Sequence, residues 1–244
     1  MMEKKKLVVF SGAGVSAESG IPTFRDSNGL WENHKIEEIA DPKGWDKDKE
    51  KVLNFYNVMR AKLKDYAPNK AHKIIAELEE HFDVSVVTQN IDDLHERAGS
   101  TKVVHLHGEL LKSRSTVNPN LRYECLGDIN IGDKCARGSQ LRPDIVWFNE
   151  NVFHLDKAAE LVSKSDFLLV IGTSLNVWPA AGLLYVVGDQ TKTFCIDPKD
   201  VLEEVDLETV THIKSIGSVG MEVFREIIMK DKDKKEESCC FEKK

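Results

Sequence analysis

The amino-acid sequence predicts an α/β fold: a parallel sheet with helices on both faces, plus a small inserted domain. Three observations predict it. Short apolar runs typical of buried strands alternate with segments that have a helical apolar period. A glycine-rich turn directly follows the first of these runs. Two segments without a strand period, one of them strongly polar, interrupt the alternation.

The strands are predicted from nearly continuous apolar runs, which indicate strands buried on both faces of a sheet. Two amphipathic helices are predicted over 69–82 and 219–229, the first with Asn69 as its N-cap. Because strands and helices alternate along the chain, neighbouring strands are expected to be parallel. The predicted strands are residues 6–10, 83–88, 103–106, 167–171, 193–196 and 212–216.

The segments that break this alternation define the predicted domain organisation. The sheet domain is expected to be discontinuous, and the small domain to take its parts from the insertions. The charge-dense end of the chain, which contains Cys239 and Cys240, is expected to be a disordered tail. The predicted ranges are 1–25, 67–111 and 144–230 for the sheet domain, 26–66 for a helical part of the small domain with a loop, 112–143 for its second segment, and 231–244 for the tail.

Composition limits the partners and the compartment. The net charge of −7 argues against nucleic-acid binding, which needs a basic face. No apolar run approaches the ~20 residues of a membrane span, and the N-terminal apolar stretch is too short for a secretory signal. Five cysteines in such a chain indicate a reducing compartment. We therefore expect a cytoplasmic monomer without nucleic-acid or membrane partners.

The glycine-rich turn has the form G-x-G-x-x-[G/A], with Gly12, Gly14 and Ala17 at the three small positions. Such a turn at a helix N-terminus binds a dinucleotide pyrophosphate, although a plain strand-to-helix turn gives the same pattern. A hydride-transferring dehydrogenase would also carry an acidic residue about 20 residues later, at the end of a second strand. Here Phe24 and Arg25 follow with no such strand, which disfavours a dehydrogenase.

Polar residues follow two further predicted strands. Gln89, Asn90 and Asp92 come after one, and Thr173 and Ser174 come after another. A turn with an N-cap explains one of the first group but not all of them. Because ligands of open α/β sheets bind at the carboxyl ends of the strands, these side chains are expected to share one site.

A histidine pair lies between these two groups. His105 and His107 alternate with apolar neighbours, so one imidazole can face the crevice. A lone histidine is more often structural than catalytic. Gly108 marks a strand end directly after His107, where the imidazole can be partly exposed. A near-neutral pKa would suit His107 to general-base catalysis.

Five motifs occur in a fixed order: GAGVSAESGIPTFRD, TQNIDDLHERAG, HLHGEL, RPDIVWFNE and GTSLNVWPAAGL. Together they resemble the sirtuin family of NAD-dependent protein lysine deacylases, from about Leu7 to about Phe224. The resemblance implies a Rossmann-like NAD domain and a small domain, with an acyl-lysine peptide in the cleft between them. It also implies that the acyl group moves from lysine to ADP-ribose and that nicotinamide is released.

The resemblance assigns roles to individual residues. His107 would be the general base, and Asn90 and Asp92 would hold the ribose and carboxamide. NAD would contact Gly12, Ala13, Gly14, Glu18, Pro22, Thr23, Phe24, Arg25, Trp31, Gln89, Asn90, Ile91, Asp92, Gly172, Thr173, Ser174 and Asp197. The substrate would contact Tyr56, Met59, Val146, Phe148, Asn149 and Glu150.

Three substrate-side departures from the family pattern carry expectations of their own. Residues 146–150 align with the strand that pairs with the substrate backbone, and Asn149 replaces the usual glycine, so its side chain is expected to narrow or redirect the peptide groove. Asp197 replaces an asparagine at the adenosine ribose and is expected to keep that role.

Tyr56 fits a Tyr-x-x-Arg pair that recognises acidic acyl groups, but Met59 occupies the arginine position. Since methionine cannot pair with a carboxylate, removal of succinyl or malonyl groups is expected to be weakened. Alternatively, both side chains merely pack a helix.

The largest departure concerns zinc. Sirtuins usually carry two C-x-x-C pairs, whose four thiolates bind zinc tetrahedrally. Alignment places these positions on Ser115, Asn118, Lys134 and Arg137. The remaining Cys125 and Cys135 cannot supply four ligands. The resemblance with these losses therefore predicts a small domain without structural zinc.

Two alternatives to the deacylase remain on the same fold. One is a non-catalytic sensor of NAD or ADP-ribose, and the other is a protein ADP-ribosyltransferase. Because His107, Asn90 and Asp92 are all present, an active enzyme is favoured.

Overall fold

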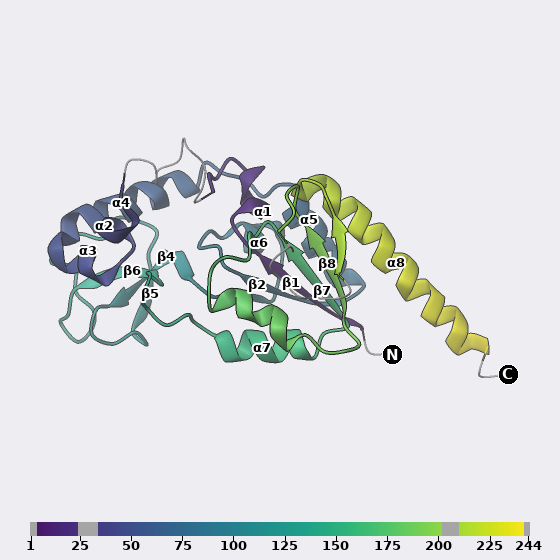
Figure 1. Cartoon of the computed structure of the whole chain (residues 1–244). Coiled ribbons are helices and arrows are strands. Elements are labelled where there is room, and N and C mark those ends of the chain that lie inside the picture. The colour runs from purple at the N-terminus through teal and green to yellow at the C-terminus, as the bar shows by residue number, and fades with distance from the viewer. Residues whose placement is uncertain (1–3, 24–33, 202–209, 242–244) are drawn as a thin grey trace.

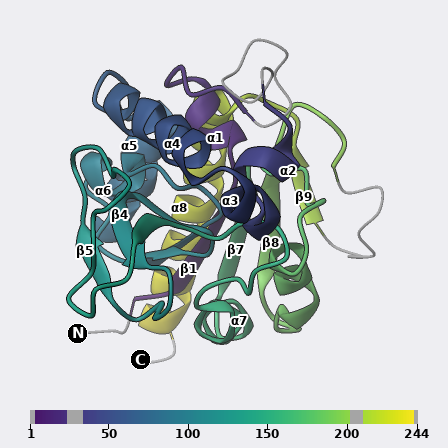
Figure 2. The same cartoon turned by 90° about the vertical axis from the view of Figure 1, so that its left-hand side faces the viewer.

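The computed structural model describes residues 4–23, 34–201 and 210–241, with side chains of the last helix described up to residue 232. Two sheets form the framework, one of six strands and one of three. The smaller sheet and its helices lie at one end of the molecule, and the large sheet forms the rest (Figures 1 and 2). The predicted class, a parallel sheet with covering helices and a small second unit, is confirmed.

The large sheet is parallel throughout, in the strand order β3-β2-β1-β7-β8-β9. Successive strands are added outward from β1 on one side and from β7 on the other, so the order reverses between β1 and β7. That reversal opens a crevice at the carboxyl ends, where ligands of such sheets bind. The strands are β1 (Lys6–Ser11), β2 (Asp83–Thr88), β3 (Val103–His105), β7 (Phe167–Ile171), β8 (Lys192–Ile196) and β9 (Val210–Ile213).

Helices cover both faces of this sheet. On one face α5 (Lys70–Glu77) and α8 (Gly217–Phe241) bury Ile75 and Phe224 against the strands. On the other face α7 (Leu155–Ser163) and the 3-10 helix η2 (Ala180–Val186) bury apolar side chains of their own. The remaining short helices of this unit are α1 (Gly14–Ala17), η1 (Leu78–Glu80) and α6 (Leu94–Ala98). In the described ranges, no helix is both long and apolar enough to cross a membrane.

The start of α5 confirms the predicted N-cap. The side-chain oxygen of Asn69 accepts hydrogen bonds from the backbone N–H groups of Ala71 and His72 at 2.9 and 3.4 Å. These bonds satisfy amide groups that have no partner within the helix. The helix therefore begins where the sequence indicated.

The small unit combines an antiparallel sheet with three helices. Its sheet has the order β5-β4-β6, and Tyr56 and Trp147 lie in a core shared by the helices and the sheet. Its strands are β4 (Gly108–Ser115), β5 (Arg122–Glu124) and β6 (Leu141–Ile145), and its helices are α2 (Ile36–Ile39), α3 (Pro42–Lys47) and α4 (Lys49–Leu63).

The structure corrects the sequence expectation at three places. The boundaries at 111 and 144 fall inside β4 and β6, whose inward-facing Arg114 and Asp144 hide the apolar alternation of these strands. Residues 146–150 form a loop with a turn at 148–149 instead of a strand. The expected disordered tail is helical as far as Phe241, because its lysine and glutamate residues favour continuation of α8.

Candidate active site

The loops after β1 and β7 pack against one another at the reversal of strand order. The backbone N–H of Gly14 donates to the carbonyl of Gly172 at 2.8 Å. A Cβ atom on Gly14 would lie 2.8 Å from Gly172 Cα, and one on Gly12 would lie 2.7 Å from Thr173 Cβ. The two glycines of the motif are therefore required by the contact between the loops. Gly14 and Ala13 keep part of their surface exposed at the crevice.

Gln89 connects the second strand end to this pair of loops. Its Oε1 accepts a hydrogen bond from Thr173 Oγ1 at 2.9 Å. Its Nε2 is buried and has no hydrogen-bond partner within the described residues. A buried amide donor without a partner is costly unless a ligand accepts from it. The site thus offers a donor that fits a polar ligand such as NAD.

His107 is held beside Gln89 in a defined protonation state. Its Nδ1 lies 3.0 Å from the carbonyl oxygen of Gln89, which can only accept, so Nδ1 carries the proton. Burial lowers the pKa of His107, and the Gln89 carbonyl offsets this only in part. The imidazole is therefore neutral near pH 7, with Nε2 free to accept a proton. Gly108, at φ 85°, directs the chain away immediately afterwards, since a Cβ there would lie 1.9 Å from the Asp144 carbonyl oxygen.

His105 has the opposite character. Its Nδ1 lies 2.9 Å from the Asn90 carbonyl oxygen and its Nε2 lies 2.8 Å from a carboxylate oxygen of Glu96. Burial lowers the pKa of His105, but the Glu96 carboxylate and the Asn90 carbonyl outweigh burial and the net shift is upward. Because both ring nitrogens face acceptors, His105 is a structural imidazolium. Of these two histidines, His107 is the one with the form of a general base.

Asn90 and Asp92 are fixed by one buried hydroxyl group. Ser16 Oγ donates to Asp92 Oδ2 at 3.0 Å and accepts from Asn90 Nδ2 at 3.1 Å. His72 Nε2 approaches the same hydroxyl at 3.5 Å. These three contacts use the single donor and both acceptor sites of a serine hydroxyl. Burial also raises the pKa of Asp92.

Two buried histidines lie beneath this network, and sequence reasoning assigned neither. His95 Nε2 lies 3.0 Å from Ser11 Oγ, and the two imidazole rings of His72 and His95 are 4.8 Å apart. Burial lowers the pKa of His72 to about 4 and lowers that of His95 well below its usual value. The sequence contained one signal that could have identified His72: this polar residue falls on the apolar face of α5, at a core position.

Other predicted cofactor residues are placed outside this cluster of contacts. Asp197 follows β8 at the same edge of the sheet and its Oδ1 accepts from the Lys199 backbone. Glu18 instead accepts two hydrogen bonds from Ser218, at the start of α8. Ile91 packs against the small-unit core. Ser174 follows Thr173 directly, and Pro22 and Thr23 follow α1, both half-buried. Phe24, Arg25 and Trp31 lie outside the described residues.

The structure places the two residues of the acyl-recognition pattern in the small-unit core. Tyr56 is fully buried, and its hydroxyl oxygen accepts from Trp147 Nε1 at 3.1 Å. Burial raises the pKa of Tyr56. Met59 packs against the same core. The neighbouring Arg60 donates to the Leu110 carbonyl at 2.8 Å, so its guanidinium ties α4 to β4.

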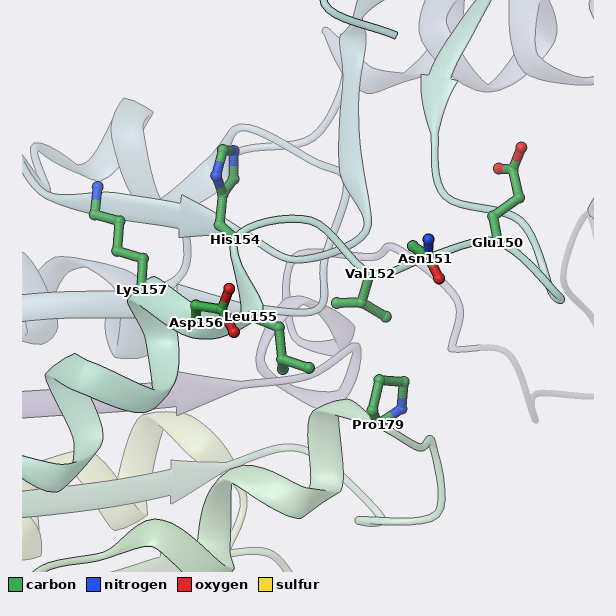
Figure 3. Close-up of a pocket in the computed structure, with 8 residues that line it drawn as sticks. All are labelled: Glu150, Asn151, Val152, His154, Leu155, Asp156, Lys157 and Pro179. Atoms are coloured by element: carbon green, nitrogen blue, oxygen red, sulfur yellow. The ribbon is translucent and has the colours of Figure 1, made fainter.

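The turn at 146–150 connects the small unit to the strand-end cluster. The Val146 N–H donates to the His107 carbonyl at 2.9 Å, so this turn is attached directly to the backbone of the candidate base. A cavity of about 580 Å³ adjoins Glu150 at the far end of the turn. In Figure 3, Val152 and Leu155 point toward Pro179 across this cavity. Of the predicted substrate residues, Glu150 alone lines this cavity within the described part of the chain.

The position expected for zinc holds a different set of groups. Ser115 Oγ lies 2.8 Å from Ser139 Oγ, which lies 3.0 Å from Cys135 Sγ. One thiol and two hydroxyls bonded to each other do not fit the four thiolate or imidazole ligands of structural zinc. Among the residues whose placement is described, no three His, Cys, Asp or Glu side chains gather in a metal-binding group.

Comparisons with known proteins show which proteins this chain is similar to. The sequence model of the Sir2 family matches residues 12–179. An NAD-dependent protein deacylase of Helicobacter pylori is 56% identical over 195 residues, which are 80% of this chain and 85% of the relative. One from Bacteroides thetaiotaomicron is 47% identical over 232 residues, covering 92% and 98% of the two chains. A crystal structure of a Sir2 homolog–NAD complex is 39% identical with a TM-score of 0.82, covering 94% of this chain and 91% of that chain.

Proposed function

The chain belongs to the Sir2 family of NAD-dependent protein deacylases, and we propose that it moves an acyl group from a protein lysine to ADP-ribose, with His107 as the general base. Acyl-lysine proteins or peptides would be its substrates. Nicotinamide would be released alongside acyl-ADP-ribose. The observation that carries the proposal is the neutral His107, which is fixed by the Gln89 carbonyl at 3.0 Å and has an unprotonated Nε2.

NAD would bind as a co-substrate along the carboxyl ends of β1, β2 and β7. Gln89 Nε2, which has no hydrogen-bond partner in the part of the chain that the structure describes, and the exposed parts of Ala13 and Gly14 support this placement. Asn90 and Asp92 would hold the ribose and the carboxamide, because Ser16 fixes both side chains. The proposed set also includes Phe24, Arg25 and Trp31 from the family resemblance.

The protein's contribution to this chemistry is alignment and proton transfer. A neutral amide oxygen is a weak nucleophile, so the acyl group must be held close to the ribose carbon and shielded from water. His107 would then take a proton from a ribose hydroxyl. Its low pKa keeps it unprotonated for this task at neutral pH.

One incubation tests the proposal against its alternatives. The protein is mixed with NAD and an acetyl-lysine peptide, and the products are identified by mass spectrometry. Release of nicotinamide together with acyl-ADP-ribose supports the deacylase. ADP-ribose attached to protein would indicate an ADP-ribosyltransferase, NADH would indicate a dehydrogenase, and NAD binding without turnover would indicate a sensor.

We further propose that acidic acyl groups are poor substrates. Met59 cannot form an ion pair, and Nε and Nη1 of Arg60 already donate to the backbone carbonyl oxygens of Leu110 and Gly127. Tyr56 has its hydroxyl bonded to Trp147. Values of kcat/KM on acetyl- and succinyl-lysine peptides of one sequence should therefore favour the acetyl peptide. A preference for the succinyl peptide would refute this specificity without refuting the deacylase.

A further inference from the structure

The turn that follows β6 is held from two directions. On one side the Phe148 N–H donates to the Ala40 carbonyl at 2.9 Å, and Asn149 Nδ2 donates to Asp41 Oδ2 at 2.8 Å. On the other side Glu150 accepts from Arg142 Nη1 at 2.6 Å and from the Trp147 N–H at 2.9 Å. The middle of the turn is thus tied to the start of α3, and its end is tied to β6.

Asp41 is a fixed acceptor for Asn149. Its other oxygen, Oδ1, accepts from the Lys43 N–H at 2.8 Å and so caps the N-terminus of α3. The side chain is buried, with 8% of its surface exposed. Because the helix cap fixes the orientation of the carboxylate, Oδ2 is held in the position where Asn149 Nδ2 donates to it. A charged acceptor also makes the bond stronger than one between neutral groups.

Asn149 combines two properties that suit this position. It has φ 67°, the left-handed region that glycine adopts freely and that asparagine tolerates best among the other residues. It also carries an amide that can donate to a carboxylate. A glycine at this position, as the family usually has, would give the same turn without the bond to α3. The side chain is therefore directed to Asp41, whereas the sequence led us to expect that it narrows or redirects the peptide groove.

We propose that the hydrogen bond between Asn149 and Asp41 pre-orders the turn 146–150 for the substrate peptide, which makes both residues positioning residues. The inference rests on the proposed function, in which this turn receives the extended acyl-lysine peptide. If a loop is ordered before the peptide binds, the entropy cost of ordering it is no longer part of the binding step. The bond should thus lower the KM for peptide and leave the chemical step unchanged.

The test uses four variants of the full chain: Asn149→Gly, Asn149→Asp, Asp41→Asn and the double variant Asp41→Asn/Asn149→Asp. Asn149→Gly should raise the peptide KM about tenfold, the loss of one hydrogen bond to a charged group. Asn149→Asp should raise it further, because two carboxylates then face each other. Asp41→Asn should have an effect below about threefold, since Asn149 can turn its amide to accept.

The double variant exchanges donor and acceptor. The introduced amide at position 41 still caps α3 through its oxygen and donates to the introduced carboxylate at position 149, so the peptide KM should return to within about threefold of wild type. In all four variants kcat and the KM for NAD should stay near wild-type values. Asn120→Gly, at an exposed loop asparagine of the small unit, is the matched control and should not change the peptide KM.

The outcomes separate the inference from the function on which it rests. An unchanged or lower peptide KM in Asn149→Gly would overturn the inference, because the side chain would then be idle or an obstruction. Failure of the double variant to recover from Asn149→Asp, with thermal unfolding unchanged, would also overturn it. If wild type releases no acyl-ADP-ribose, the proposed function itself fails. In that case isothermal calorimetry measures the Kd for the acetyl-lysine peptide in the same variants, and this Kd tests whether the Asn149–Asp41 bond pre-orders the turn.

Discussion

His107 shows how one backbone carbonyl prepares a side chain for catalysis. The Gln89 carbonyl fixes the proton on Nδ1, and burial keeps Nε2 unprotonated at neutral pH. His105, only two residues away, is instead an imidazolium because its second nitrogen faces Glu96. Which histidine can act as a base is thus decided by its hydrogen-bond partners.

Replacing His107 tests its role as base. His107→Ala should lower kcat by at least about a hundredfold, the usual contribution of a general base, while the NAD Kd from calorimetry changes little. In wild type the active form is neutral, so activity should fall as the pH drops through the His107 pKa. Because that pKa is lowered, the acid limb of kcat/KM should have its midpoint below pH 6.5. Retained turnover in His107→Ala would exclude the role.

Gly172 illustrates a residue chosen for the absence of a side chain. It has φ 61°, and a Cβ there would lie 2.3 Å from the backbone nitrogen of Val15. Gly172→Ala should therefore destabilise the protein by about 2 kcal/mol or more and weaken NAD binding, measured by thermal unfolding and calorimetry. Gly127→Ala is the control, since a Cβ there has no heavy atom within 4 Å. Equal behaviour of the two variants would contradict the packing argument.

At the scale of elements, α5 and α6 bring two neutral histidines beneath the site. His72 is on α5 and His95 is on α6, with ring centroids 4.8 Å apart. Burial disfavours the charged form of both. The contact between the two helices therefore depends on these histidines staying neutral.

This contact predicts a loss of stability in acid. The folded pKa of His72, about 4, lies below the unfolded value of 6.5, so its contribution is complete above pH 6.5 and is lost as the pH falls toward 4. Between pH 7 and pH 5 the free energy of unfolding of wild type should fall by ~2 kcal/mol more than that of His72→Gln. Urea unfolding at both pH values measures the difference. His81→Gln, at a partly exposed histidine, should follow wild type, and an equal fall in His72→Gln would contradict the prediction.

At the scale of the whole molecule, two units are joined through the site. The large sheet supplies the strand ends, and the small unit supplies the turn that follows β6. The bond from Val146 to the His107 carbonyl connects them at the candidate base. Helix packing, a buried ion-pair cluster of Arg114, Arg142 and Glu150, and side-chain hydrogen bonds hold the small unit together.

The small unit is predicted to need no zinc. Elemental analysis of the purified protein should find less than stoichiometric zinc, because Ser115, Cys135 and Ser139 do not form a zinc ligand set. If the small unit folds without metal, incubation with a strong chelator should leave the Tm within ~2 °C of the untreated protein. One equivalent of bound zinc, or a clear loss of Tm with chelator, would contradict this prediction.

The large sheet was predictable because its signals are local. Its strands are continuous apolar runs, and the caps and turns between them have their own residue types, such as Asn69. The small sheet was not predicted because inward-facing charged residues, such as Arg114 and Asp144, break the apolar alternation of β4 and β6. Their burial depends on partners distant in the sequence.

The sequence by itself determined the succession of strands along the large sheet's part of the chain, the motifs of an NAD-dependent deacylase family, and the candidate base. These follow from apolar periodicity and from residue types at fixed spacing. Only the tertiary structure decided that His107 is neutral, that Ser16 connects Asn90 to Asp92, and that Asn149 binds Asp41. Each of these depends on the distance and burial of groups brought together by folding, and neither quantity is encoded in local sequence.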